Sequence, residues 1–95
     1  MNDKLKNLKL DYLFNAMLVL ENLDECYAFF EDLCTVQELC ALSQRLMVAK
    51  MLSQKRVYSD IVAETGASTA TISRVNRSLA YGSDGYQIVF DRLGE

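Results

Sequence analysis

The chain has no histidine, no proline and no tryptophan, and only four glycines and three cysteines among its 95 residues. Without histidine, the common Ser–His and Cys–His catalytic mechanisms and most zinc sites are excluded. The lack of proline and the small number of glycines leave few helix breakers, which favours helices. The inventory therefore predicts neither an enzyme nor a metal-binding protein.

The cysteines are Cys26, Cys34 and Cys40, and no two of them form a Cys-x-x-Cys pair. An odd number of cysteines without such a pair is typical of reduced, buried thiols, which predicts a cytoplasmic protein. Residues 1–9 are polar and carry spaced lysines, unlike a secretory signal. The most apolar run, residues 10–20, is too short to span a bilayer, so we expect no membrane association.

Charge is distributed unevenly along the chain, although the total is only −3. Residues 1–40 carry a net charge of −5, residues 41–80 carry +4, and residues 81–95 carry −2. A basic middle segment creates a local positive field that can bind phosphate even on an acidic protein. Charge alone leaves open the alternative that these cations only solvate a helix face.

Hydrophobic periodicity predicts a single all-α domain of about six helices. Residues 4–21 are expected to form one helix, and 9 of the 11 residues in its segment 10–20 are apolar. Because a helix that is apolar nearly all round must be covered on more than one side, this segment predicts a partner subunit; the alternative is a helix at the centre of the chain's own core. A second helix is expected to start at Asn22, and a capping box, Thr35 with Glu38, opens a third that runs to about Ser53.

Two short helices, over about residues 60–65 and 69–81, are joined by Gly66-Ala67-Ser68 in a helix-turn-helix pattern. Gly66 supplies a left-handed turn residue, and Ser68 is a good N-cap. Gly82 is expected to end the second of these helices, and Ser83 to cap a last one. On a helical wheel, Ile72, Val75 and Leu79 of the second helix face the core. The opposite face carries short side chains and arginines: Thr69, Ala70, Ser73, Arg74 and Arg77.

Short side chains at the start of this helix would let it enter the major groove of DNA, and arginines would hold phosphates or guanine edges. We therefore predict binding to double-stranded DNA. The expected contacts are Lys55, Arg56, Ser59, Ser68, Thr69, Ala70, Thr71, Ser73 and Arg77.

Three segments carry a resemblance to a known family: Leu42-Ser-Gln-Arg45, the run from Ser59 to Arg74, and Ser78-Leu79. Together they resemble the Trp repressor family, and most of all its Trp repressor-like YerC/YecD type. The resemblance implies an intertwined homodimer that binds a palindromic operator and regulates transcription, with repression as the expected mode. It also divides the single domain, residues 1–95, into dimerisation helices (1–54), a helix-turn-helix (58–81) and a C-terminal dimerisation helix (83–95).

The resemblance further implies a corepressor pocket, whose family residues match Thr35, Arg45, Arg74 and Ser78. Val75 stands where the Trp repressor has glycine, and a β-branched side chain there would occupy volume that an indole ring needs. We therefore expect that tryptophan is not the corepressor, and that another ligand or none is used. Ser59 replaces a base-reading arginine of the family, which predicts a different operator.

A second function from another class is a helical protein-interaction module that has lost DNA binding. The acidic ends of the chain favour this alternative, whereas the arginines around the second short helix favour DNA.

Overall fold

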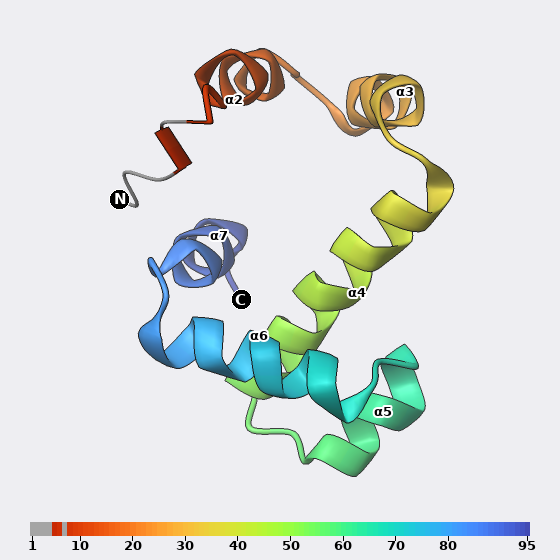
Figure 1. Ribbon diagram of the computed structural model, residues 1–95, viewed down its shortest axis with the longest axis vertical. Coiled ribbons are helices and arrows are strands. Elements are labelled where there is room, and N and C mark those ends of the chain that lie inside the picture. The colour runs from red at the N-terminus through yellow and green to blue at the C-terminus, as the bar shows by residue number, and fades with distance from the viewer. Residues whose placement is uncertain (1–4, 7) are drawn as a thin grey trace. The chain divides into compact units, whose positions relative to one another are not determined.

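The computed structural model describes residues 5, 6 and 8–95. Within that part of the chain it contains helices and no strands, as the sequence predicts. The chain divides into two compact units, Met1–Leu39 and Cys40–Glu95, which are described separately. None of the described helices is long and apolar enough to cross a membrane. Residues 8–95 form six helices: α2 (Asp11–Leu18), α3 (Leu23–Leu33), α4 (Val36–Ser53), α5 (Tyr58–Thr65), α6 (Thr69–Tyr81) and α7 (Gly85–Leu93) (Figure 1).

The continuous helix expected over residues 4–21 is wrong, because α2 covers only Asp11–Leu18. Lys9 has a φ of 58°, a left-handed backbone that a right-handed helix does not continue. At the other end, the Val19 and Leu20 amides bond to carbonyls three positions back, at 3.4 and 3.2 Å, so the α-helical hydrogen-bond pattern ends with Leu18. Lys4 and Asn7 lie outside the described residues.

The two N-terminal caps that the sequence predicts are confirmed. The side-chain oxygen of Asn22 accepts a hydrogen bond of 2.9 Å from the Glu25 amide. The Thr35 amide donates to the Glu38 carboxylate at 2.9 Å, and the Glu38 amide donates to the Thr35 hydroxyl at 3.1 Å. The Thr35 amide, and then its hydroxyl, lower the pKa of Glu38, because both favour the ionised carboxylate.

The hydrophobic core lies in the second unit and joins four helices. Of the three residues predicted to face inward from the second short helix, Ile72 and Val75 are buried and Leu79 packs half-buried against them. The inward face of α6 is therefore confirmed. The buried side chains are Val48, Ala49 and Met51 of α4, Ile61 of α5, Ala67 of the turn, Ile72 and Val75 of α6, and Phe90 of α7.

The turn between α5 and α6 also follows the prediction. Gly66 ends α5 with a φ of 70°, and its amide donates to the Val62 carbonyl at 2.9 Å. The Ser68 hydroxyl accepts from the Thr71 amide at 3.1 Å and so caps α6. The bounds of α6 match the predicted 69–81, whereas α5 begins two residues earlier than the predicted 60.

The connection from α6 to α7 confirms one prediction and corrects another. Gly82 ends α6, and a Cβ there would lie 2.3 Å from the Ser78 carbonyl oxygen, so only glycine fits this approach. Ser83 does not cap the last helix. Asp84 holds the N-cap position with a left-handed φ of 61° and no side-chain cap bond, so α7 begins one residue later than a Ser83 cap requires.

The end of α4 forms a Schellman motif around Lys55. The Arg56 amide donates to the Met51 carbonyl at 3.0 Å, and the Lys55 amide donates to the Leu52 carbonyl at 2.9 Å. Lys55 occupies the left-handed position of the motif, with a φ of 60°. Glycine is the usual residue there, because any Cβ is strained in this conformation.

We predict that Lys55→Gly raises the free energy of unfolding by up to about 1 kcal/mol, because it relieves the left-handed strain. Chemical denaturation at fixed protein concentration measures the change. Lys55→Ala is the matched control: it removes the same charge but keeps a Cβ, and it should stay within about 0.5 kcal/mol of the unmodified protein. Equal gains in both variants would show that lysine charge, not backbone strain, sets the effect.

Candidate nucleic-acid interface

The N-terminal end of α6 presents small side chains on its outer side. Thr69, Ala70 and Ser73 are exposed, while Ile72 is fully buried on the inner side. Thr71 is half-buried, and its hydroxyl accepts a hydrogen bond of 3.1 Å from Ser68. Of the residues expected to contact DNA here, Ser68 and Thr71 therefore serve the cap, and Thr69, Ala70 and Ser73 form an open face.

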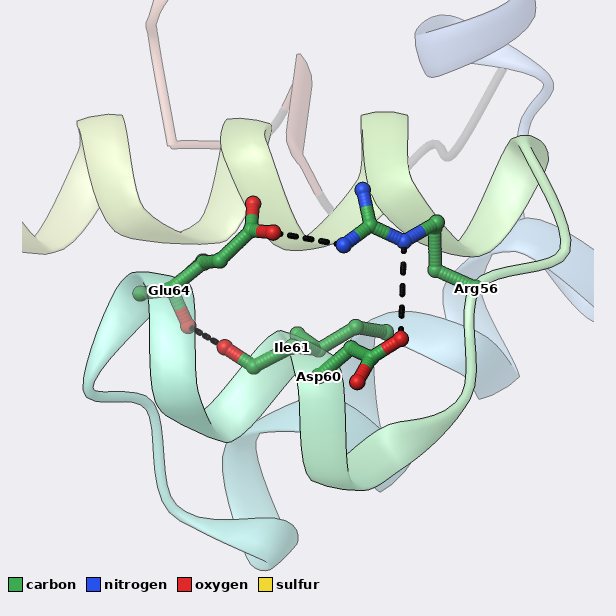
Figure 2. Close-up of polar contacts among 5 residues, drawn as sticks. Arg56, Asp60, Ile61 and Glu64 are labelled. Carbon is green, nitrogen blue, oxygen red and sulfur yellow. Dashed lines mark hydrogen bonds and ion pairs between the residues drawn. The ribbon is translucent and has the colours of Figure 1, made fainter.

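The second element of this region is α5 with the connection that precedes it. Ser59, in the first turn of α5, and Lys55, in the connection, are both exposed. Arg56 is half-buried, and its guanidinium lies between two carboxylates of α5 (Figure 2). The Arg56 Nη2–Glu64 Oε1 distance is 2.5 Å and the Nε–Asp60 Oδ2 distance is 3.8 Å.

The cations of the second unit therefore differ in their surroundings. In the part of the chain that the structure describes, the ion pairs are Lys50–Glu95, at 2.8 Å, and the two pairs of Arg56. None of these pairs includes Lys55, Arg74 or Arg77, all of which are exposed. These three side chains carry the positive charge that is open to solvent near α6.

An open groove of about 480 Å³ lies where α6, α7 and α4 meet in the second unit. Of the five residues expected at a corepressor site, only Ser78 lines it. Val75 is 2% exposed and belongs to the core instead. The groove is lined by Leu46, Ser78, Gly82, Ser83, Gly85, Tyr86 and Val89.

The other three expected ligand residues lie in different surroundings. Thr35 belongs to the first unit, and both its amide and its hydroxyl are used in the capping box of α4. Arg45 is half-buried on α4, and Arg74 is exposed on α6. Within the second unit, the expected DNA residues thus lie on α5, on α6 and beside the turn that joins them, whereas Ser78 alone of the four expected ligand residues in that unit lines the groove.

Sequence reasoning missed two polar contacts in this region: the pairing of Arg56 with Glu64 and a hydrogen bond made by Gln44. The Gln44 side-chain amide donates to the Thr65 carbonyl oxygen at 3.1 Å, which links α4 to the end of α5 across 21 residues. No local pattern signals such a bond, since a glutamine on a helix is ordinarily solvated. The described residues contain no group of three or more cysteine or acidic side chains placed to hold a metal ion.

The comparisons with known proteins agree with this geometry. A family model described as Trp repressor protein matches residues 8–94. The uncharacterized protein YerC of Bacillus subtilis (strain 168) is 56% identical over 93 residues, which are 98% of this chain and 89% of YerC.

Two crystal structures extend the likeness to three dimensions. A TrpR-like protein from Eubacterium eligens ATCC 27750 is 62% identical with a TM-score of 0.92, covering 98% of this chain and 96% of that one. A candidate Trp repressor from Staphylococcus aureus is 58% identical with a TM-score of 0.91, covering 97% and 92% of the two chains. The chain therefore belongs to the Trp repressor family, which is a family of regulators and not of enzymes.

Proposed function

We propose that this protein is a homodimeric transcriptional regulator, in the mode of a repressor, that binds a palindromic site on double-stranded DNA through α5 and α6. The observation that carries the proposal is the two-sided character of α6. On its inner side, Ile72 and Val75 are buried in the core. On its outer side, the capped N-terminal end exposes Thr69, Ala70 and Ser73. A helix that reads the major groove needs this combination.

Charge around α6 supports binding to phosphate. Lys55, Arg74 and Arg77 are exposed and take no part in the ion pairs of the described residues. Phosphate contacts position such a protein on DNA, while base contacts from the start of the helix give specificity. We therefore assign the sequence preference to Ser59, Thr69, Ala70 and Ser73, and the phosphate contacts to Lys55 and Arg77.

Burial supports the homodimer. No described residue before Val48 is buried, although this part of the chain includes α2, α3 and the first turns of α4. Large apolar side chains stand exposed there, among them Tyr12 at 87% and Leu18 at 80%. Exposed apolar surface of this kind is typical of an interaction site. A second copy of the chain buries it in an intertwined dimer built from residues 1–54 and 83–95.

A cytoplasmic location follows from the same proposal, because the protein must reach DNA. The three cysteines are free thiols, which suits a reducing compartment. The expectation that they are buried is wrong, because Cys26 and Cys34 are half-buried and Cys40 is exposed. The competing function, a helical protein-interaction module without DNA binding, is favoured by the net charge of −3 and by the acidic segment 1–40. The salt dependence of DNA binding distinguishes the two.

We predict that the protein is a dimer at micromolar concentration, with twice the mass of the 10.8-kDa chain in light scattering. The physical reason is the exposed apolar surface of the first unit, which calls for an interface of roughly 2,000 Å² or more. Tyr12→Glu, which places a charge on that surface, should shift the mass toward the monomer. A clean monomer of the unmodified protein would disprove the dimer.

We predict that DNA binding weakens steeply with salt, and that Arg77→Ala lowers the slope of log affinity against log salt by about one for every DNA sequence. Thr69→Ala should instead change which sequence is preferred in a selection from random duplexes, because it removes a groove contact. Fluorescence anisotropy with labelled duplexes measures the slope. Arg92→Ala, which removes the same charge from the last turn of α7, is the matched control and should leave the slope unchanged.

A shallow salt slope for the unmodified protein would favour the protein-interaction module. An unchanged sequence preference in Thr69→Ala would show that the N-terminal end of α6 does not face the bases.

We predict that L-tryptophan shows no saturable binding at micromolar concentration and gives no gain in DNA affinity. Val75 fills the core, and neither Arg45 nor Arg74 lines the groove beside Ser78. Because the chain has no tryptophan, added ligand is the only indole fluorophore in the sample. Val75→Ala should cost about 1.5–3 kcal/mol of stability without creating a tryptophan site. Tight binding by that variant while folded would place Val75 in a ligand pocket.

A further inference from the structure

The C-terminal end of α5 is held by two polar contacts that sequence reasoning did not foresee. We propose that Gln44 and Arg56 are positioning residues that together fix the helix-turn-helix turn, and with it the start of α6, on α4. The four residues of this arrangement, Gln44, Arg56, Glu64 and Thr65, are called the turn latch below. The consequence for DNA binding rests on the proposed function, whereas the effect on the turn itself does not.

The first contact of the latch uses a carbonyl that the helix leaves without a partner. Thr65 is the last residue of α5, and the final carbonyls of a helix have no donor within it. The Gln44 amide supplies that donor at 3.1 Å, and both residues are half-buried. The bond therefore joins α4 directly to the point where α5 gives way to the turn.

The side chain of Thr65 links the end of α5 to the turn that follows it. Its hydroxyl donates to the Ile61 carbonyl at 2.7 Å and accepts from the Ala67 amide at 3.1 Å. Ala67 is 2% exposed in the core, and Ser68, which follows it, caps α6. One side chain thus connects the held end of α5 with the residue before the cap, so a shift of Thr65 displaces the beginning of α6.

The second contact holds the outer side of the same helix end. The Arg56 amide is fixed by its bond to the Met51 carbonyl, which aims the side chain from the end of α4 toward α5. Its guanidinium bonds to Glu64 and lies 3.8 Å from Asp60, as Figure 2 shows. The hydrogen bond that Arg56 donates to Glu64, and then the charge of Glu64, raise the pKa of Arg56, so the guanidinium stays charged.

This arrangement separates two neighbouring cations. Arg56 is engaged with two carboxylates, so its charge is neutralised locally before any phosphate approaches. Lys55 takes part in no ion pair among the described residues. We therefore assign to Arg56 a positioning role in place of the phosphate contact expected from the sequence, and leave that contact to Lys55.

Amide hydrogen exchange in the free protein tests the latch without DNA. In Gln44→Ala, the Gly66 and Ala67 amides should exchange roughly three- to tenfold faster, the factor that the loss of one hydrogen bond produces. The Val48 and Ala49 amides in the core part of α4 should keep their rates. Gln37→Ala is the matched control: this exposed glutamine on the same helix makes no side-chain hydrogen bond with another described residue and should change nothing. Unchanged exchange at Gly66 and Ala67 in Gln44→Ala would overturn the proposal.

Glu64→Gln and Arg56→Gln test the outer contact, and both leave the core intact because neither side chain belongs to it. Both should speed exchange at Gly66 about twofold, since exposed ion pairs contribute little, and Arg56→Lys should restore part of the protection. DNA affinity should fall in Gln44→Ala and in Arg56→Gln with an unchanged salt slope. A slope lower by about one in Arg56→Gln would show a phosphate contact and overturn the positioning role. If the unmodified protein binds no DNA, the proposed function fails, and the exchange results still decide the latch.

Discussion

The geometry of the helix-turn-helix depends on one small buried cluster. Val48 of α4, Ile61 of α5 and Ile72 of α6 are fully inaccessible to solvent and belong to the same group of packed side chains. Because each of the four helices contributes only one to three residues to the core, the directions of α5 and α6 are set together and not one at a time. The outer face of α6 is consequently presented in a fixed orientation, although no polar residue is fully buried among the described positions.

The sequence predicted the elements whose signals are local. Asn22, Thr35 with Glu38, Gly66 and Ser68 each act on a residue at most four positions away, so their effect can be seen in the order of residues alone. Two of the errors in helix bounds arose where a residue other than glycine adopts a left-handed backbone, at Lys9 and at Asp84. Lysine does not indicate that conformation, and aspartate, which adopts it more often than most residues, does not require it.

In the candidate site, too, the features with local signals were predictable and the long-range contacts were not. The exposed face of α6 was predictable, because helical periodicity places Ile72 and Val75 opposite Thr69 and Ser73. The surroundings of Arg56 were not, because they depend on a turn that brings Glu64 back across eight residues. The same applies to Gln44 and Thr65, which are 21 residues apart. Tertiary packing determines such long-range polar contacts, and it cannot be predicted from composition and residue spacing.

The lack of any buried residue among the described positions before Val48 has a thermodynamic consequence. In the proposed dimer, this half of the chain gains its packing only by association, so the free energy of unfolding depends on protein concentration. Each tenfold dilution then removes about 1.4 kcal/mol, which is a large share of the stability of a small domain. The abundance of the protein in the cell would thus help to determine how much of it is folded and able to bind.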